Sequence, residues 1–145
     1  EYGLLYNWFA VNDSRKLAPA GWHIPTDDEW KELELYLGMS QLNADKVNWR
    51  GDNEGDKLKT EGPQGWTFHE NIWGTNETGF SALAGCCCVF NGVFGSPGLN
   101  STGFWWSSSR HENQAWYRYL DYKNSNIFRY YGPRTYGFSV RCVKD

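Results

Sequence analysis

The residues with the clearest chemical character are the tyrosines in the last third of the chain. Six of the nine tyrosines lie between positions 117 and 136. The stretch 115–121 alternates with a period of two, and a β-strand sends successive side chains to opposite faces. One face carries Trp116, Arg118 and Leu120, and the other carries Tyr117, Tyr119 and Asp121. Tyrosine offers a large, rigid contact area at a low cost in entropy, so this composition favours ligand recognition.

We predict that the tyrosine face, continued along the chain, forms a ligand-binding surface. Arg118 shares its face with apolar side chains, so it should be a hydrogen-bonded scaffold residue. Ile127 and Arg129 continue the scaffold phase, which places Phe128 and Tyr130 on the outer face. The predicted ligand-binding residues are Arg110, His111, Asn113, Gln114, Tyr117, Tyr119, Asp121, Tyr122, Asn124, Asn126, Phe128, Tyr130, Tyr131 and Arg134. The alternative is that these aromatic residues pack beneath a loop.

A run of three cysteines, Cys86-Cys87-Cys88, is a second group that could do chemistry. Adjacent side chains in a strand point to opposite faces, whereas zinc sites prefer a gap of two residues between cysteines. No second pair of Cys or His lies at metal spacing in the sequence. We predict small buried or half-buried residues here, as free cysteine usually is, with a metal or redox site as the alternative.

The segment 52–56, Asp-Asn-Glu-Gly-Asp, is dense in oxygen ligands and could hold Ca²⁺. Its spacing does not match an EF-hand, and a solvated loop is the alternative interpretation. Ser107 to Ser109 and His111 suggest a serine hydrolase only weakly, because no Gly-x-Ser-x-Gly context surrounds them. We therefore predict no catalytic residues, and no cofactor apart from this possible Ca²⁺.

Several local patterns predict the elements that position these residues. Thr26 and Glu29 form a capping box, Trp30, Leu33 and Leu37 repeat with helical spacing, and Gly38 supplies a stop, which predicts a helix over 26–37. A second helix is expected within 40–47. Strands are expected over 2–11, within 76–84 and 86–94, and over the closing run 137–143. An extended segment is expected at 17–25, irregular chain over 48–74 and a turn at 95–98.

Composition limits the class of protein. A chain of 145 residues favours a single domain over 1–145. Aromatic residues total 26, against 20 for Leu, Ile and Val together, so the core should be largely aromatic. The net charge is −3 and no cluster of Lys and Arg could follow a phosphate backbone, so nucleic-acid binding is not predicted. No run of 18 apolar residues predicts a membrane span, and we expect the domain to be part of a longer protein.

A set of landmarks, in this order, resembles the Fibrobacter succinogenes major paralogous domain. The landmarks are 3–8 (GLLYNW), 21–26 (GWHIPT) with Glu29-Trp30, 57–59 (KLK), 78–83 (TGFSAL), 91–94 (NGVF), 105–108 (WWSS), 115–118 (AWYR) and 137–143 (GFSVRCV). That family is similar to the C-type lectin fold of the formylglycine-generating-enzyme type, and variable proteins of diversity-generating retroelements look similar too. The resemblance implies an α+β domain with short helices, a small twisted antiparallel sheet and much irregular chain. It also implies a ligand surface near the C-terminal end.

Two positions depart from the pattern of the resembling family. Family members often carry a cysteine that can pair with the cysteine of the final strand, but Ala18 stands there, so we expect Cys142 to face inward beside Phe138 and Val140 without a disulfide. The triple cysteine stands where Gly and Arg are more usual. An enzyme of the formylglycine-generating type would need a reactive cysteine pair near the C-terminal end, where the sequence has Cys142 alone, so we do not expect that activity.

These observations together predict a non-enzymatic ligand-recognition domain. The resemblance implies a protein or carbohydrate partner, and an extracellular, cell-surface or virion location in a bacterial or phage protein. It also raises the possibility of a retroelement variable protein whose diversified residues fall within 105–141. The alternatives are an oxidoreductase of the formylglycine-generating type and a structural module of a surface protein.

Overall fold

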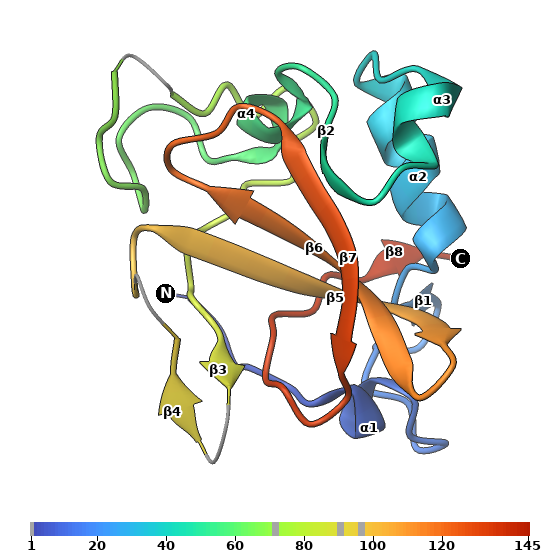
Figure 1. Ribbon diagram of the computed structural model, residues 1–145. Coiled ribbons are helices and arrows are strands. Elements are labelled where there is room, and N and C mark those ends of the chain that lie inside the picture. The colour runs from blue at the N-terminus through green and yellow to red at the C-terminus, as the bar shows by residue number, and fades with distance from the viewer. Residues whose placement is uncertain (1, 71–72, 90–91, 96–97) are drawn as a thin grey trace.

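A four-stranded antiparallel sheet stands at the centre of the computed structural model, which describes residues 2–70, 73–89, 92–95 and 98–145 (Figure 1). The helices are α1 Trp8–Val11, α2 Asp27–Tyr36, α3 Gln41–Ala44 and α4 Glu54–Leu58. The strands are β1 Trp22–His23, β2 Asn48–Arg50, β3 Cys88–Val89, β4 Val93–Phe94, β5 Thr102–His111, β6 Gln114–Asp121, β7 Ile127–Pro133 and β8 Val143–Lys144. The expectation of an α+β protein with short helices and small antiparallel sheets is confirmed.

The strand order of the central sheet is β2-β7-β6-β5, and two small pairs, β1-β8 and β3-β4, lie beside it. Residues paired across neighbouring strands point to the same face, so the register assigns the side chains to two faces. We call one the helix face; it comprises Trp105, Arg118, Leu120, Ile127 and Arg129. We call the other the aromatic face; it comprises Trp49, Phe104, Trp106, Tyr117, Tyr119, Phe128 and Tyr130.

Helix α2 covers the helix face, and it begins where the sequence predicts. The Thr26 hydroxyl accepts a hydrogen bond from Glu29 N at 3.2 Å, and Glu29 Oε2 accepts one from Thr26 N at 2.8 Å, which completes the capping box. The helix ends at Tyr36, and Gly38 follows with a φ of +110°, a conformation that favours glycine. The predicted helix over 26–37 is therefore confirmed, and α3 confirms the second helix within 40–47.

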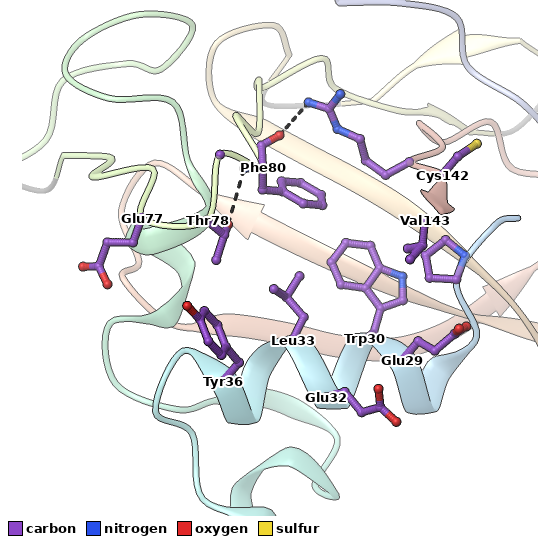
Figure 2. Close-up of a pocket in the computed structure, with 13 residues that line it drawn as sticks. Glu29, Trp30, Glu32, Leu33, Tyr36, Glu77, Thr78, Phe80, Cys142 and Val143 are labelled. Carbon is purple, nitrogen blue, oxygen red and sulfur yellow. Dashed lines mark hydrogen bonds between the residues drawn. The ribbon is translucent and has the colours of Figure 1, made fainter. Parts of the chain in front are cut away.

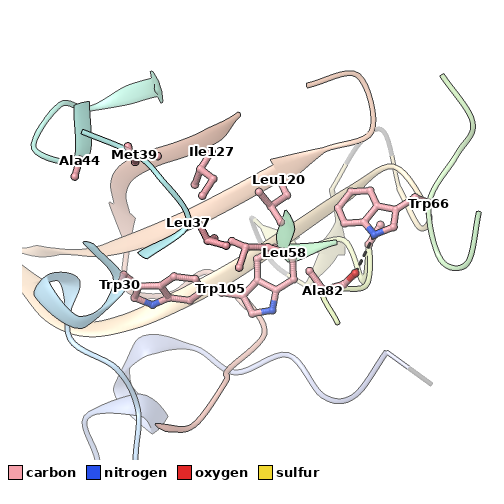
Figure 3. Packing of buried hydrophobic residues seen from close by; sticks show 11 residues of the cluster. Trp30, Leu37, Met39, Ala44, Leu58, Trp66, Ala82, Trp105, Leu120 and Ile127 are labelled. Atoms are coloured by element: carbon pink, nitrogen blue, oxygen red, sulfur yellow. Dashed lines mark hydrogen bonds between the residues drawn. The ribbon is translucent and has the colours of Figure 1, made fainter. Parts of the chain in front are cut away.

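A hydrophobic core lies on each side of the central sheet. The first core, shown in Figure 3, lies under α2 and contains Trp30, Leu37, Met39, Ala44, Leu58, Trp66, Ala82, Ala84, Trp105, Leu120 and Ile127. The second core lies against the β5 side of the aromatic face and contains Trp8, Val11, Ile24, Cys86, Cys87, Trp106, Ala115 and Phe138. Both cores depend on aromatic side chains, as the composition predicts.

The predicted strand over 2–11 is wrong. Residues 8–11 form α1, which Asn7 caps by accepting a hydrogen bond from Ala10 N at 3.0 Å, and only Tyr6 pairs, through an isolated bridge to Phe138. The Trp8 side chain is 1% exposed, and its Nε1 donates to the carbonyl oxygen of Ser107 at 2.9 Å. Burial of this ring in the second core outweighs the strand preference of the aromatic residues, because β-propensity depends on context.

Two further strand predictions differ from the structure. The segment 76–84 contains an isolated bridge at Ala82 and no strand, because the chain turns at Asn76 and Ser81, whose φ angles are positive. In the closing run, residues 137–139 form single bridges to three different partners, and the strand β8 is only Val143–Lys144. The predicted irregular segment 48–74 contains β2 and α4.

The extended segment 17–25 contains β1, and the segment 86–94 contains β3 and β4, as expected. The turn predicted at 95–98 lies partly outside the described residues, since 96 and 97 are not described. Of the helices described, none combines the length and the apolar character that a membrane span requires.

Candidate ligand-binding surface

A buried network of charges fixes the helix face of the sheet. Arg118 is 1% exposed, and it donates from Nη1 to Asp27 Oδ1 at 2.7 Å and from Nε to Glu34 Oε1 at 2.6 Å. Arg129 Nη2 lies 2.6 Å from Asp27 Oδ2, and Arg50 Nη2 lies 2.8 Å from Glu34 Oε2. The prediction that Arg118 is a hydrogen-bonded scaffold residue is confirmed, and Arg129 shares that role.

The electrostatics of Asp27 follow from this geometry. Burial by itself would raise the pKa of this carboxyl group, since it disfavours the charged form. The hydrogen bonds and positive charges of Arg129 and Arg118 outweigh burial and lower the pKa to about 2. Asp27 therefore stays ionised, and it holds the first turn of α2 against β6 and β7.

The predicted alternation of β6 is confirmed at its centre. Arg118 and Leu120 are each 1% exposed on the helix face, and Tyr117 and Tyr119 point to the opposite side. The aromatic face is nevertheless closed on its β5 side. The Phe138 ring lies 5.0 Å from that of Phe104 and 5.1 Å from that of Tyr117. Burial raises the pKa of Tyr117 to about 12, so this residue also contributes to the second core.

The rest of the aromatic face forms a cluster of rings that we call the aromatic patch; it comprises Trp49, Tyr119, Phe128 and Tyr130. The Trp49 ring lies 5.1 Å from that of Tyr119 and 5.2 Å from that of Phe128. The Phe128 ring lies 5.7 Å from that of Tyr119 and 5.9 Å from that of Tyr130. Trp49 is 37% exposed and the other three are half-buried. The patch is therefore closely packed within itself and partly open to solvent.

Asp121 orients one ring of the aromatic patch. The Tyr119 hydroxyl donates to Asp121 Oδ2 at 2.6 Å, and the Lys123 amide donates to Oδ1 at 2.8 Å. Burial, together with the hydrogen bond to Asp121, raises the pKa of Tyr119. Tyr119 therefore remains protonated, with its hydroxyl held toward the end of β6.

The aromatic patch continues toward the turn that joins β5 to β6. Tyr130 stacks on Tyr131 with their centroids 4.5 Å apart, and Tyr131 stacks on His111 at 3.9 Å. Tyr131 lies on the helix-face phase of β7 and its ring lies 5.1 Å from that of Trp116, so this row of rings passes from one face of the sheet to the other. The predicted residues Arg110, Asn113 and Gln114 lie at the same turn.

Arg134, which follows β7, supports this turn. Its Nε donates to the carbonyl oxygen of Asn113 at 3.1 Å, and its guanidinium lies 5.2 Å from the centre of the Phe9 ring. We use the name recognition surface for the aromatic patch together with Arg110, His111, Asn113, Gln114 and Tyr131. Arg134 acts here as a support for the turn at its edge.

The predicted residues of the β6–β7 turn pack against α4 and the first core. Tyr122 packs against the first core, Lys59 Nζ donates to the carbonyl oxygen of Asn124 at 2.8 Å, and a Cβ atom on Gly55 would lie 2.5 Å from the carbonyl oxygen of Asn126. Strand β6 has eight residues, so this turn is about 23 Å from the β5–β6 turn. The structure therefore packs this turn against α4 and the first core, at the opposite end of β6 from Arg110, Asn113 and Gln114.

Trp49 is the residue of this surface that the sequence did not indicate. It lies in β2, a strand of three residues inside a segment whose glycines predict irregular chain. Three residues are too few to show a period of two. The available signal was a lone tryptophan between two polar residues, which does not reveal a strand partner.

The carboxylates of the predicted Ca²⁺ segment make internal contacts. Glu54 is 3% exposed and its Oε2 accepts from Asp52 N at 2.6 Å, while Asp56 Oδ1 lies 2.9 Å from Lys59 Nζ. Within the described ranges, no group of three or more His, Cys, Asp or Glu is placed to hold a metal ion. Ca²⁺ binding at 52–56 stays a prediction.

The cysteines are all free thiols in the structure. Cys86 and Cys87 are buried in the second core, and burial raises the pKa of Cys87 to about 12. Cys142 is half-buried and packs on that core together with Val140, close to the expected position. Burial also raises the pKa of Cys142, so the neutral, unreactive thiol is favoured at Cys87 and Cys142.

The comparisons with known proteins identify the family. A family model described as the Fibrobacter succinogenes major domain matches residues 1–144. The chain belongs to this family. No curated protein and no solved structure matches the chain. The family resemblance inferred from the sequence landmarks is therefore confirmed over almost the whole length of the domain.

Proposed function

We propose that this member of the Fibrobacter succinogenes major domain family is a non-enzymatic ligand-recognition domain with a C-type lectin-like fold. The observation that carries the proposal is the continuous row of rings from Trp49 to His111, which a buried ion network holds in place from the opposite face of the sheet. The partner is a protein or a carbohydrate on a cell surface, and the domain works outside the cell or on a virion.

Two physical features support the proposal. Rigid aromatic side chains lose little entropy on binding, and Trp, Tyr and Arg are the residue types that dominate binding energy at interfaces. Clustered, partly exposed rings on a protein surface usually mark an interaction site. The recognition surface also lies mostly within 105–141, the stretch that would be diversified if the protein were a retroelement variable protein.

The test compares the wild-type domain with a variant that carries Trp49→Ala, Phe128→Ala and Tyr130→Ala. Both are applied to an array of defined glycans and purified cell-surface proteins, with and without Ca²⁺. We expect the wild-type domain to bind at least one component saturably and the variant to bind it at least about 30-fold more weakly, since a hot-spot residue contributes about 2 kcal/mol.

Phe68→Ala is the matched control, because Phe68 is 60% exposed and its ring contacts Trp73, outside the recognition surface. It removes an aromatic side chain without touching the row of rings, so binding should not change. Equal binding by the wild-type domain and the triple variant would contradict the proposal. Loss of binding in EDTA would additionally assign Ca²⁺ a role.

A further inference from the structure

A groove of about 800 Å³ lies between α2, the loop at 77–80 and residues 141–143 (Figure 2). Its apolar lining comes from Trp30 and Leu33 on the helix and from Phe80 on the loop. Tyr36 stands at its rim and is 82% exposed. No residue of the groove belongs to the recognition surface, so the groove is a separate feature of the molecule.

The charged residues that line the groove carry a net negative charge. They are Glu29, Glu32, Glu77 and Arg141. Glu29 is engaged by His23 Nε2 at 2.7 Å and by the capping box. Arg141 is anchored too, because its Nη2 donates to the carbonyl oxygen of Phe80 at 2.8 Å.

The two remaining carboxylates lie on opposite rims, Glu32 on α2 and Glu77 on the loop (Figure 2). In the described part of the chain, Glu32 has no hydrogen bond or ion pair, and Glu77 accepts only from the Thr75 hydroxyl at 3.3 Å. Unpaired carboxylates along an apolar groove raise the local concentration of cations. The charge of the groove therefore selects a positively charged ligand.

Trp30 supplies an independent indication that a ligand belongs here. Its side chain is 2% exposed, and its indole Nε1 is buried without an acceptor among the described residues. Figure 2 shows the indole nitrogen on the side of the ring toward Val143, another residue of the groove lining. A buried N–H without an acceptor is unfavourable, and an acceptor atom brought into the groove would relieve it.

We propose that this groove binds a short extended segment of a partner protein that carries a Lys or Arg side chain next to an apolar side chain. The ammonium or guanidinium group pairs with Glu32 or Glu77, and the apolar side chain packs on Leu33 and Phe80. A main-chain carbonyl of the segment accepts from the Trp30 indole. A polypeptide offers these three groups together, whereas the carboxylates repel a nucleic-acid phosphate and a free amine would leave most of the volume empty.

The probe is a fluorescein-labelled, end-capped hexapeptide of alternating Leu and Lys, compared with peptides in which Gln or Glu replaces Lys. We expect the Lys peptide to bind, the Gln peptide to bind more weakly and the Glu peptide not to bind. Fluorescence anisotropy measures the affinities, which should fall as salt is added because the carboxylates are exposed to screening. The NMR signal of the Trp30 indole N–H, assigned with Trp30→Phe, should shift when the Lys peptide binds.

Variants locate the binding site. Glu32→Gln and Glu77→Gln should each weaken binding of the Lys peptide about two- to fivefold, and Tyr36→Ala should weaken it as well. Glu61→Gln is the matched control, because it removes the same charge from an exposed position outside the groove. Trp49→Ala should leave peptide binding unchanged, so this proposal can fail independently of the recognition surface.

Three results would overturn the assignment of this groove. They are equal affinity for the Lys and Gln peptides, unchanged affinity in the double variant Glu32→Gln/Glu77→Gln, and an unmoved Trp30 signal at saturating peptide. Each of them would show that positive charge, the rim carboxylates or the indole donor, respectively, plays no part in binding.

Discussion

The two faces of the central sheet are built from the same alternating strands but are stabilised in opposite ways. The helix face buries three arginines against two carboxylates, and each charged group there depends on particular partners at short distance. The aromatic face stacks rings, which gain energy from area and need few specific partners. A layer of rings can therefore be covered on its β5 side and exposed to solvent on its β2 side. The charge network must stay covered throughout, because each buried charge needs its partners. This difference explains how one sheet can serve as scaffold and as binding surface.

The largest expected effect comes from breaking the helix face. Arg118→Ala should lower the free energy of unfolding by about 3–5 kcal/mol, because it leaves buried carboxylates short of a partner. Urea titration followed by tryptophan fluorescence measures the change. Arg110→Ala is the control, since Arg110 is exposed at the β5–β6 turn and should change stability by less than about 0.5 kcal/mol. Similar values for the two variants would show that the network does not hold the sheet.

The covered side of the aromatic face should be somewhat less sensitive. Phe138→Ala should cost about 3 kcal/mol, at the lower end for a buried Phe, because the surrounding rings can partly collapse into the space. Phe138 is 2% exposed and touches rings of β5 and β6. Phe138→Leu keeps much of the volume and should cost clearly less in the same titration. An unchanged stability of Phe138→Ala would mean that the second core is not tightly packed.

Acid should weaken the helix face before it affects the rings. The pKa of Asp27 is about 2 in the folded protein, whereas the pKa of an ordinary aspartate is 3.8. Its contribution of about 2 kcal/mol is present above pH 4 and is lost as the pH falls from 3.8 to 2. Urea titrations across this range measure the loss. The variant Asp27→Asn should be less stable at neutral pH and should depend less on pH over that window; an equal dependence would contradict the assignment.

The smallest effect on stability is expected on the open side of the aromatic face. Trp49→Ala and Tyr130→Ser should each cost about 1 kcal/mol or less of stability, since both residues are partly exposed, while ligand binding weakens. Tyr117→Ser, on the covered side, should cost more because this ring touches Trp106 and Phe138. Thermal melts of the three variants separate them. A larger loss for Trp49→Ala than for Tyr117→Ser would reverse the assignment of open and covered sides.

The sequence indicated all residues of the recognition surface except Trp49. The alternation of β6 correctly separated Arg118 from Tyr119, because both faces of this strand meet well-defined surroundings. The same pattern could not show that Phe138 covers Tyr117, since that contact joins residues 21 positions apart through a closing run without regular pairing. It also could not show that the β6–β7 turn packs on α4, which depends on the close approach of Gly55 to Asn126.

The sequence by itself determined what local interactions control: the capping box and extent of α2, the phase of the long strands, the aromatic character of the cores and the membership of the family. Only the tertiary structure decided features that depend on long-range contacts. Trp8 became helical because its ring is buried beside Ser107, and Trp49 joined the aromatic patch because β2 pairs with β7. Local patterns record the preferences of neighbouring residues, whereas burial is decided by segments that meet only in the folded chain.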